Sequence, residues 1–593
     1  MKKFITLLML MCLGLTQSVQ LWAQREAKPF EWRMLNHWDN LDGTVERGYA
    51  GRSIFWPTLQ RDKIEAYAQE NEALGINAIV PNNVNASPRM LTREILEQTR
   101  DLADMLRPHG IRVFLAVNFA SPQALGELPT ADPLDKNVQK WWKNKVKEIY
   151  TLIPDFGGFL VKANSKGQPG PNDFGRTHAE GANMLARALK PYKGVVMWRA
   201  FVYSPSDPDR AKQAYLEFQP LDGQFLDNVI IQVKNGPIDF QPREAFSPLF
   251  ASLRKTKVMA ELQITQEYLG HSNHIAFLAP LWTEFMQQLR DYTDCQLTAV
   301  AGVANIGDGS QLGNDPTTLC GNHMAESNWY AFARLASDPT LTSEQIARDW
   351  VYRKFPALDS RLIPQARATK NIVNMMLRSH EAVVDYMMPL GLHHQFAWGH
   401  HYGPEPYCAI PGARPDWMPS YYHKADAEGL GFNRSSTGSD ATGQYPEAYG
   451  QLLDNPETCP YQLLLWFHHV AWNKEIAHTY GQTTAKESLW DALCHHYQHG
   501  LDEVRQMQRE WDVAEYQLGN ATIFTDIQRR LRIQARDAQW WKDGCLLYFQ
   551  TFSHMPFPAD VEPSVHNLQE LIDIKLGITN EECPTQQLLD SKR

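Results

Sequence analysis

Two carboxylates are placed along the chain in a way that could support sugar chemistry. Asp239 and Glu267 each follow a short apolar run, and the two runs are neighbours in the sequence. Hydrolysis of a glycosidic bond with inversion needs two carboxyl groups. One protonates the leaving oxygen, and the other deprotonates a water molecule on the opposite face of the sugar. We therefore expect Asp239 and Glu267 to be able to share one water molecule.

Cations accompany these carboxylates. Lys162, Arg199 and Lys234 lie at the ends of three successive apolar runs, so they would line one arc of a common site. An arginine can bind a carboxylate through two parallel hydrogen bonds, and lysines add point charge. A negatively charged sugar, such as a uronic acid, would suit this arc. The alternative is internal pairing of the cations with the carboxylates of Asp239, Glu261 and Glu267.

The apolar runs are the elements that must position these side chains. Eight runs predict strands, at Met34–Trp38, Asn77–Pro81, Arg112–Asn118, Gly158–Lys162, Val195–Phe201, Val229–Lys234, Val258–Gln263 and Leu297–Asn305. Most are near-continuous, which is typical of parallel strands buried on both faces. Helical spacing separates several of them, at Asp62–Leu74, Thr92–Leu106, Asn137–Ile153 and Thr177–Leu189. This alternation predicts an α/β fold, a (β/α)₈ barrel, and the polar residues gather at the strand ends where barrel active sites form.

The rest of the chain predicts a mainly α-helical C-terminal domain. The expected helices are Ser343–Lys354, Asn371–Val384, Leu463–Thr479, Trp490–Met507 and Ile523–Phe549. Between them, Pro389–Gln451 is rich in Gly, Pro, His and Tyr. We expect this loop-rich segment to reach either towards the site or towards a neighbouring subunit.

Other classes of chemistry lack their motifs. The chain has no dinucleotide fingerprint, P-loop, nucleophile elbow or His-Glu-x-x-His zinc motif. Paired histidines occur, and Cys494-His495-His496 is the most ligand-like group. Adjacent helical residues point roughly 100° apart and make poor chelators. We expect packing or loop histidines, no metal and no other cofactor. The net charge of −10 lacks the basic footprint of a nucleic-acid binder.

The chain begins with an export pattern. Lys2 and Lys3 precede an apolar stretch, Phe4–Leu15, and a polar region ends near Ala23. This predicts a signal peptide over residues 1–23 and a periplasmic or secreted protein. No later apolar run approaches the ~20 residues of a membrane span, so no stable span is expected after cleavage. We expect the barrel over residues 24–335 and the helical domain over 336–593.

Long stretches of the chain carry a further pattern. They are Leu35–Asp42, Val45–Gly51, Asp155–Ser165, Gly175–His178, Met197–Tyr203, Gln232–Glu244 and Glu261–Gly270. Together they resemble the α-glucuronidases of glycoside hydrolase family 67, from about Trp32 to near the C-terminus. The resemblance implies a (β/α)₈ barrel with a helical C-terminal domain through which homodimers can form. It also implies metal-free, inverting removal of α-1,2-linked (4-O-methyl)glucuronic acid from the terminal xylose of xylo-oligosaccharides, that is, from the aldouronic acids of glucuronoxylan.

The resemblance also implies roles for individual residues. Asp239 and Glu267 match the pair that activates water. The residues carried over as substrate-binding are Lys162, Arg199, Lys234, Trp38, Glu46 and Arg47. For the first three, this agrees with the charge argument above.

Two features depart from the family. The family normally carries an α/β domain ahead of the barrel, and we expect that domain to be missing because the export segment runs almost directly into the first strand. The family's fourth strand ends Lys-Ala-Asn-Ser-Glu-Gly, where the glutamate is the general acid. The corresponding stretch is Lys162–Gly167, with Lys166 at the acid position.

Lys166 bears directly on the chemistry. An ordinary lysine titrates near ~10.4, too high for protonating a leaving group, although neighbouring cations and burial would lower that pKa. General acid catalysis typically contributes ~10²–10⁴-fold, and we expect activity to fall by at least that much. Three hypotheses stand: an impaired α-glucuronidase, a non-catalytic protein that binds uronates or aldouronates, or an ordinary enzyme in which Lys166 is an error or an engineered knock-out.

Overall fold

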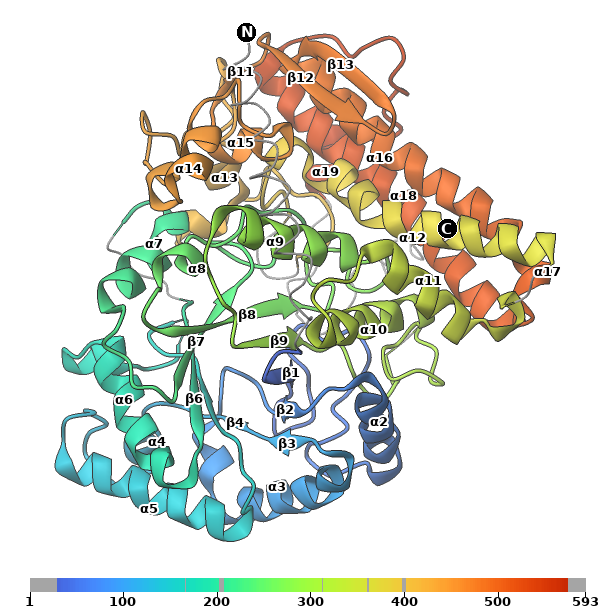
Figure 1. Cartoon of the computed structure of the whole chain (residues 1–593). Helices are drawn as coiled ribbons and strands as arrows, with labels where there is room; N and C mark the ends of the chain where they lie inside the picture. The colour runs from blue at the N-terminus through green and yellow to red at the C-terminus, as the bar shows by residue number, and fades with distance from the viewer. Residues whose placement is uncertain are drawn as a thin grey trace, which may run out of the picture.

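A barrel of parallel strands forms the first half of the protein, which a computed structural model describes over residues 29–165, 167–201, 207–311, 313–359, 362–396 and 401–573 (Figure 1). The strands are β1 (Trp32–Asn36), β2 (Ala78–Val80), β3 (Arg112–Val113), β4 (Leu115–Ala116), β5 (Gly158–Val161), β6 (Val195–Arg199), β7 (Val229–Lys234), β8 (Lys257–Gln263) and β9 (Ala299–Val303). They pair in the order β3-β2-β1-β9-β8-β7-β6-β5-β4. Phe114 alone separates β3 from β4, so the two ends of the sheet meet. The predicted (β/α)₈ barrel is confirmed, with its third strand divided into β3 and β4.

Helices connect the strands around the outside of the barrel. They are α2 (Arg61–Leu74), α3 (Arg93–Leu106), α4 (Ser121–Ala124), α5 (Lys136–Leu152), α6 (His178–Leu189), α7 (Arg210–Phe218), α8 (Leu249–Ser252), α9 (Ala279–Tyr292) and α10 (His323–Ser337). Several begin at side-chain caps that the sequence supplies. Asp135 caps α5, and Thr177 forms a capping box with Glu180 on α6. The connection between β6 and β7, which is not among the helical stretches expected from the sequence, contains α7, which Asp209 caps.

The four long predicted helices of the C-terminal region are present. They are α11 (Ser343–Lys354), α12 (Ile363–Met387), α16 (Leu489–Asp512) and α18 (Ala521–Ser553), of which the last three pack against one another. Shorter helices are α13 (Pro419–His423), α14 (Glu447–Asp454), α15 (Leu464–Phe467), α17 (Glu515–Leu518) and α19 (Leu568–Asp573). The predicted mainly helical C-terminal region is confirmed. The predicted signal peptide and the extreme C-terminus lie outside the described residues.

The predicted helix at Leu463–Thr479 is wrong. Only α15 is helical there. The chain then forms the strands β11 (Val470–Ala471), which pairs with β10 (Gly429–Leu430), and β12 (Glu475–Tyr480), which pairs with β13 (Thr483–Ser488) in a hairpin. In β12 the buried residues Ile476 and His478 alternate with exposed ones, which is the period of a half-buried strand. Pairing with the threonine-rich β13 therefore prevails over the weak helical spacing.

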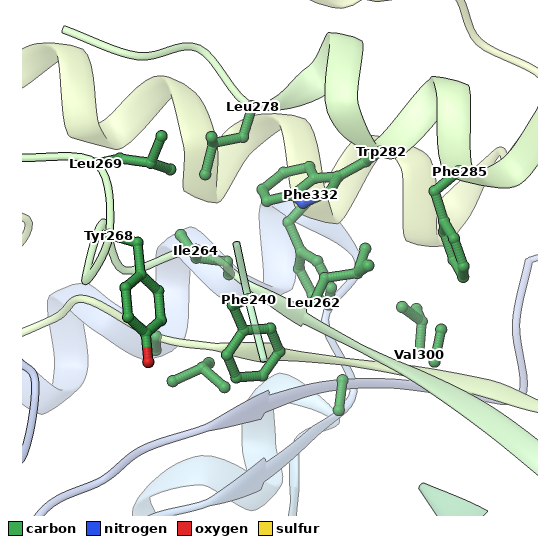
Figure 2. Packing of buried hydrophobic residues seen from close by; sticks show 14 of the residues in the cluster. Phe240, Leu262, Ile264, Tyr268, Leu269, Leu278, Trp282, Phe285, Val300 and Phe332 are labelled. Carbon is green, nitrogen blue, oxygen red and sulfur yellow. The ribbon is translucent and has the colours of Figure 1, made fainter. Parts of the chain in front are cut away.

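Apolar packing joins the C-terminal helices to the barrel. The buried apolar side chains of the described residues form one continuous cluster that includes both regions. Figure 2 shows part of it, with Leu262 of β8, Trp282 of α9 and Phe332 of α10 among the labelled side chains. Among the helices of the described residues, none has the length and apolarity needed to cross a bilayer.

Gly158 lets β5 approach β6 closely. Its φ is +139°, and a Cβ at this position would lie 1.9 Å from the carbonyl oxygen of Val195. The carbonyl oxygen belongs to the backbone of β6, so it cannot move aside cheaply. The absence of a side chain at Gly158 thus lets β5, which Lys162 directly follows, lie close to β6, which ends at Arg199.

Replacing this glycine should destabilise the barrel. Overpacking typically costs about 1–3 kcal/mol and an unfavourable backbone conformation adds about 1–2 kcal/mol, so Gly158→Ala should lower the free energy of unfolding by about 2–5 kcal/mol. The control is Gly110→Ala, because Gly110 has a φ of +72° and open space around its Cβ position. Chemical denaturation should show a clearly larger loss for Gly158→Ala. Equal losses would mean that conformation alone, and not the contact with β6, requires glycine.

Candidate active site

A single pocket at the carboxyl ends of the barrel strands brings the predicted site residues together. Its lining includes eight of the nine: Trp38, Glu46, Arg47, Lys162, Arg199, Lys234, Asp239 and Glu267. The ninth, Lys166, lies outside the described residues. Lys234 ends β7, Arg199 ends β6 and Lys162 directly follows β5, as expected for a site built at this face of a barrel.

Asp239 is only slightly exposed and lies between hydrogen-bond donors. Lys234 Nζ lies 2.5 Å from its Oδ1, the backbone N–H of Phe240 donates to the same oxygen, and the Tyr268 hydroxyl donates to Oδ2 over 2.9 Å. Burial alone would raise the pKa of this carboxyl. The charges of Lys234 and Arg210, with the hydrogen bonds, outweigh burial and lower the pKa of Asp239 well below its usual range. Asp239 is therefore a firmly ionised carboxylate.

At Glu267, burial outweighs the neighbouring positive charge. Arg47 Nε lies 3.0 Å from its Oε1, His401 Nδ1 lies 2.8 Å from the same oxygen, and Gln263 donates to Oε2 over 2.8 Å. Burial is the largest influence, and the nearby charge of Asp239 adds to it, so the pKa of Glu267 is raised despite Arg47. Two carboxylates that face one pocket are thus driven towards different protonation behaviour.

Internal pairing accounts for part of the cation arc. Arg199 makes two hydrogen bonds to the buried Glu261, of 3.0 and 2.9 Å. Lys234 pairs with Asp239 and lies over the rings of Phe201 and Phe240, at 3.7 and 4.2 Å from their centroids. Burial lowers the pKa of Lys234. The alternative raised from the sequence therefore holds for Arg199 and Lys234, although both side chains still line the pocket.

Lys162 and Glu46 belong to a separate polar network. Lys162 Nζ donates to Asn85 Oδ1 over 2.6 Å. The amide nitrogens of Asn83 and Asn85 both donate to Glu46 Oε2, each over 2.8 Å. Glu46 thus orients the amide that holds Lys162. Trp38 faces the Arg199 guanidinium, with 5.9 Å between the ring centroid and Cζ.

Several lining residues were not predicted. They are Val84, Asn85, Phe201, Arg210, Tyr268, His394, Phe396, His401 and Trp417. The last four come from the loop-rich segment Pro389–Gln451, so the expectation that this segment reaches towards the site is confirmed. Its concentration of histidine and aromatic residues was the only signal that the sequence offered for them.

The other paired histidines have packing partners. His495 contacts Glu487 and Asp560, His496 lies 2.7 Å from Asp385, and both lie far along the chain from the pocket residues. The ring N–H of His393 donates to the carbonyl oxygen of Arg243, and the ring stacks on Trp466. Among the described residues, no three histidine, cysteine or acidic side chains converge as metal ligands.

Comparisons with known proteins cover most of the chain. Residues 15–329 match the family model described as the glycosyl hydrolase family 67 middle domain, and residues 320–562 match that of the family 67 C-terminus. Alpha-glucuronidase A of Aspergillus tubingensis is 38% identical over 555 residues, which are 89% of this chain and 62% of that protein. Alpha-glucuronidase A of Emericella nidulans is 39% identical over 572 residues, 91% of this chain and 64% of that protein. The chain therefore spans about three fifths of the length of these relatives.

The buried ion pair between Arg199 and Glu261 should contribute to the stability of the barrel. Arg199→Met would leave the Glu261 carboxylate buried without its partner, which typically costs about 3–5 kcal/mol. Lys486→Met removes one partner of the exposed ion pair with Glu475 on the β12–β13 hairpin, and should change the free energy of unfolding by less than about 1 kcal/mol. Urea denaturation of the two variants tests this difference. Similar values would show that Glu261 does not depend on Arg199.

Proposed function

This chain belongs to glycosyl hydrolase family 67, and from that premise we propose that it acts as a xylan-degrading α-glucuronidase. The substrates would be aldouronic acids, from which it releases α-1,2-linked (4-O-methyl)glucuronic acid by inverting hydrolysis. The relatives named alpha-glucuronidase support this activity. The observation that carries the proposal is the pairing of two carboxylates of opposite pKa direction, Asp239 and Glu267, in one cation-lined pocket.

The pKa directions assign roles to the two carboxylates. A general base works best when its pKa is near the operating pH. Glu267, with its raised pKa, accepts a proton from water more readily than Asp239. Asp239 stays ionised, and it would orient the same water as a hydrogen-bond acceptor and stabilise positive charge on the sugar ring. Glu267 is then the general base of the proposed reaction.

The cations account for a negatively charged sugar. Lys162, Lys234 and Arg199 line the pocket on one arc, and the charge of Arg210 adds to that of Lys234 in lowering the pKa of Asp239. A uronate carboxylate entering this arc would exchange water for charged donors. Because Arg199 is held by Glu261, it offers its remaining N–H groups in a preorganised orientation, which reduces the cost of ordering on binding.

Lys166 makes reduced catalysis part of the proposal. The sequence carries a lysine where the family's pattern has the glutamate that protonates the leaving xylose. Without that acid, a sugar leaving group departs slowly. The second candidate function, a non-catalytic protein that binds uronates or aldouronates, rests on this same substitution, since Lys166 would add a cation to the arc.

Export to the periplasm or beyond, and a homodimer through the C-terminal region, stay proposals that the sequence supports.

Restoring the carboxyl tests the role of position 166. Lys166→Glu should raise kcat/KM for aldouronic acids by at least about 10²-fold, because general acid catalysis is worth that much. Release of glucuronic acid is measured beside the unchanged chain, and the anomer of the product is followed by NMR. The charge-matched control is Lys143→Glu, on the exposed face of α5, which should leave activity unchanged.

The remaining outcomes separate the candidate functions. If the unchanged chain turns over as fast as Lys166→Glu, position 166 is not where the proton donor acts. If Lys166→Glu is inactive while both proteins bind glucuronate, the pocket is a binding site and the enzyme proposal fails. An initial product with retained configuration would contradict inversion.

A further inference from the structure

One residue of the loop-rich segment touches the proposed base directly. His401 Nδ1 lies 2.8 Å from Glu267 Oε1, and Arg47 Nε reaches the same oxygen over 3.0 Å. Gln263 donates to the other oxygen. Since Arg47 and Gln263 are donors, both carboxylate oxygens act as acceptors, and Nδ1 of His401 donates. The orientation of Glu267 is therefore fixed from three separate parts of the chain.

The backbone supports the two contacts to Oε1 in an unusual way. Arg47 has a φ of +56° and His401 a φ of +55°, both in the left-handed region that residues other than glycine rarely adopt. Such conformations persist only where the surrounding structure enforces them, and they concentrate at functional sites. Thr265, two residues before Glu267, donates to the carbonyl oxygen of Arg47 over 2.8 Å. The strained backbone at Arg47 is thus held by the same loop that carries Glu267.

The long C-terminal helices hold the backbone at His401. The next residue, Tyr402, donates its hydroxyl to Asp537 of α18, and His274 Nε2 lies 2.8 Å from the same carboxylate oxygen. Tyr386 of α12 lies 2.8 Å from Nδ1 of His274. All four side chains are buried. This network ties the chain next to His401 to two helices and to the barrel loop that contains His274.

His401 also touches the environment of the second carboxylate. Its ring stacks on Tyr268, with 4.8 Å between ring centroids and 26° between ring planes. Tyr268 is the residue whose hydroxyl donates to Asp239 over 2.9 Å. One side chain of the C-terminal region therefore contacts Glu267 directly and Asp239 through a single intervening ring.

We propose that His401 is a positioning residue through which the C-terminal helical region places a hydrogen-bond donor on the carboxylate of Glu267. This inference rests on the proposed function, because it takes Glu267 as the base. It assigns the helical region a part in the chemistry that goes beyond covering the barrel. The Tyr402–Asp537 hydrogen bond anchors the chain next to His401, and the imidazole N–H of His401 donates to Glu267 Oε1.

Loss of this hydrogen bond should move the pH profile. The groups that face Glu267 are Arg47, Lys234, His401, Asp239, Tyr268 and Gln263. Removing a donor from the ionised carboxylate raises its pKa. The acidic limb of kcat/KM should therefore shift upward by about one pH unit in His401→Leu, with roughly tenfold lower activity below the limb and near-normal activity above it. His401→Asn, which keeps a side-chain N–H donor, should recover part of the shift.

Matched variants separate positioning from general damage. Tyr402→Phe removes the anchor while keeping the ring, and should shift the limb in the same direction. Tyr407→Phe is its control, since Tyr407 donates to a carbonyl at Leu571, away from the pocket. His469→Leu is the control for His401→Leu, because His469 is partly exposed and hydrogen-bonds to the backbone of Gly431. Neither control should move the pH limb.

Binding provides a readout that does not need turnover. Glucuronate affinity should fall as Glu267 ionises, so the midpoint of affinity against pH reports the same group. Both readouts are taken in the unchanged chain and with Lys166→Glu. An upward shift of the binding midpoint in His401→Leu supports the inference even if no variant releases glucuronic acid, in which case only the proposed function fails. A uniform loss of activity or affinity at every pH, with no shift of either midpoint, would overturn the inference.

Discussion

Buried charge at the mouth of the barrel is the constraint on which the rest of the site depends. Lys162, Arg199, Lys234, Asp239, Glu261 and Glu267 are all nearly inaccessible to water or only slightly exposed. Charges in such a place must be paired or shift their pKa. Glu261 forms an ion pair with Arg199, and Asp239 forms one with Lys234. Glu267 forms an ion pair with Arg47, yet its pKa is still raised. Neighbouring positive charge outweighs burial at Asp239 but not at Glu267. Asp239 therefore stays ionised, while Glu267 is able to accept a proton.

This pairing also explains why some cations serve two purposes. Arg199 is needed to compensate Glu261 inside the barrel, and its fixed guanidinium still faces the pocket. Lys234 compensates Asp239 and lies against two aromatic rings, so its ammonium has little freedom. A site assembled from such interlocked pairs is rigid before any ligand arrives. Side chains that are already fixed before the ligand binds favour both catalysis and tight binding. The geometry therefore suits both candidate functions.

The C-terminal region contributes more than a second layer. Its loop-rich segment supplies His394, Phe396, His401 and Trp417 to the pocket lining, and its helices anchor that segment through a buried network around Asp537. The continuous apolar cluster that joins helices and barrel makes this arrangement stiff. A side chain of one region can therefore hold a carboxylate of the other at hydrogen-bond distance.

The sequence by itself determined the barrel, the strand ends and the carboxylates and cations placed there, because near-continuous apolar runs and the polar residues that follow them are local patterns. It also identified the four long C-terminal helices. It was wrong at Leu463–Thr479, where pairing between β12 and β13 prevails over weak helical spacing. Only the tertiary structure decided which charges compensate one another and that His401 meets Glu267, 134 positions away. Those contacts depend on side chains that meet through packing of distant elements, and no local spacing encodes such a meeting.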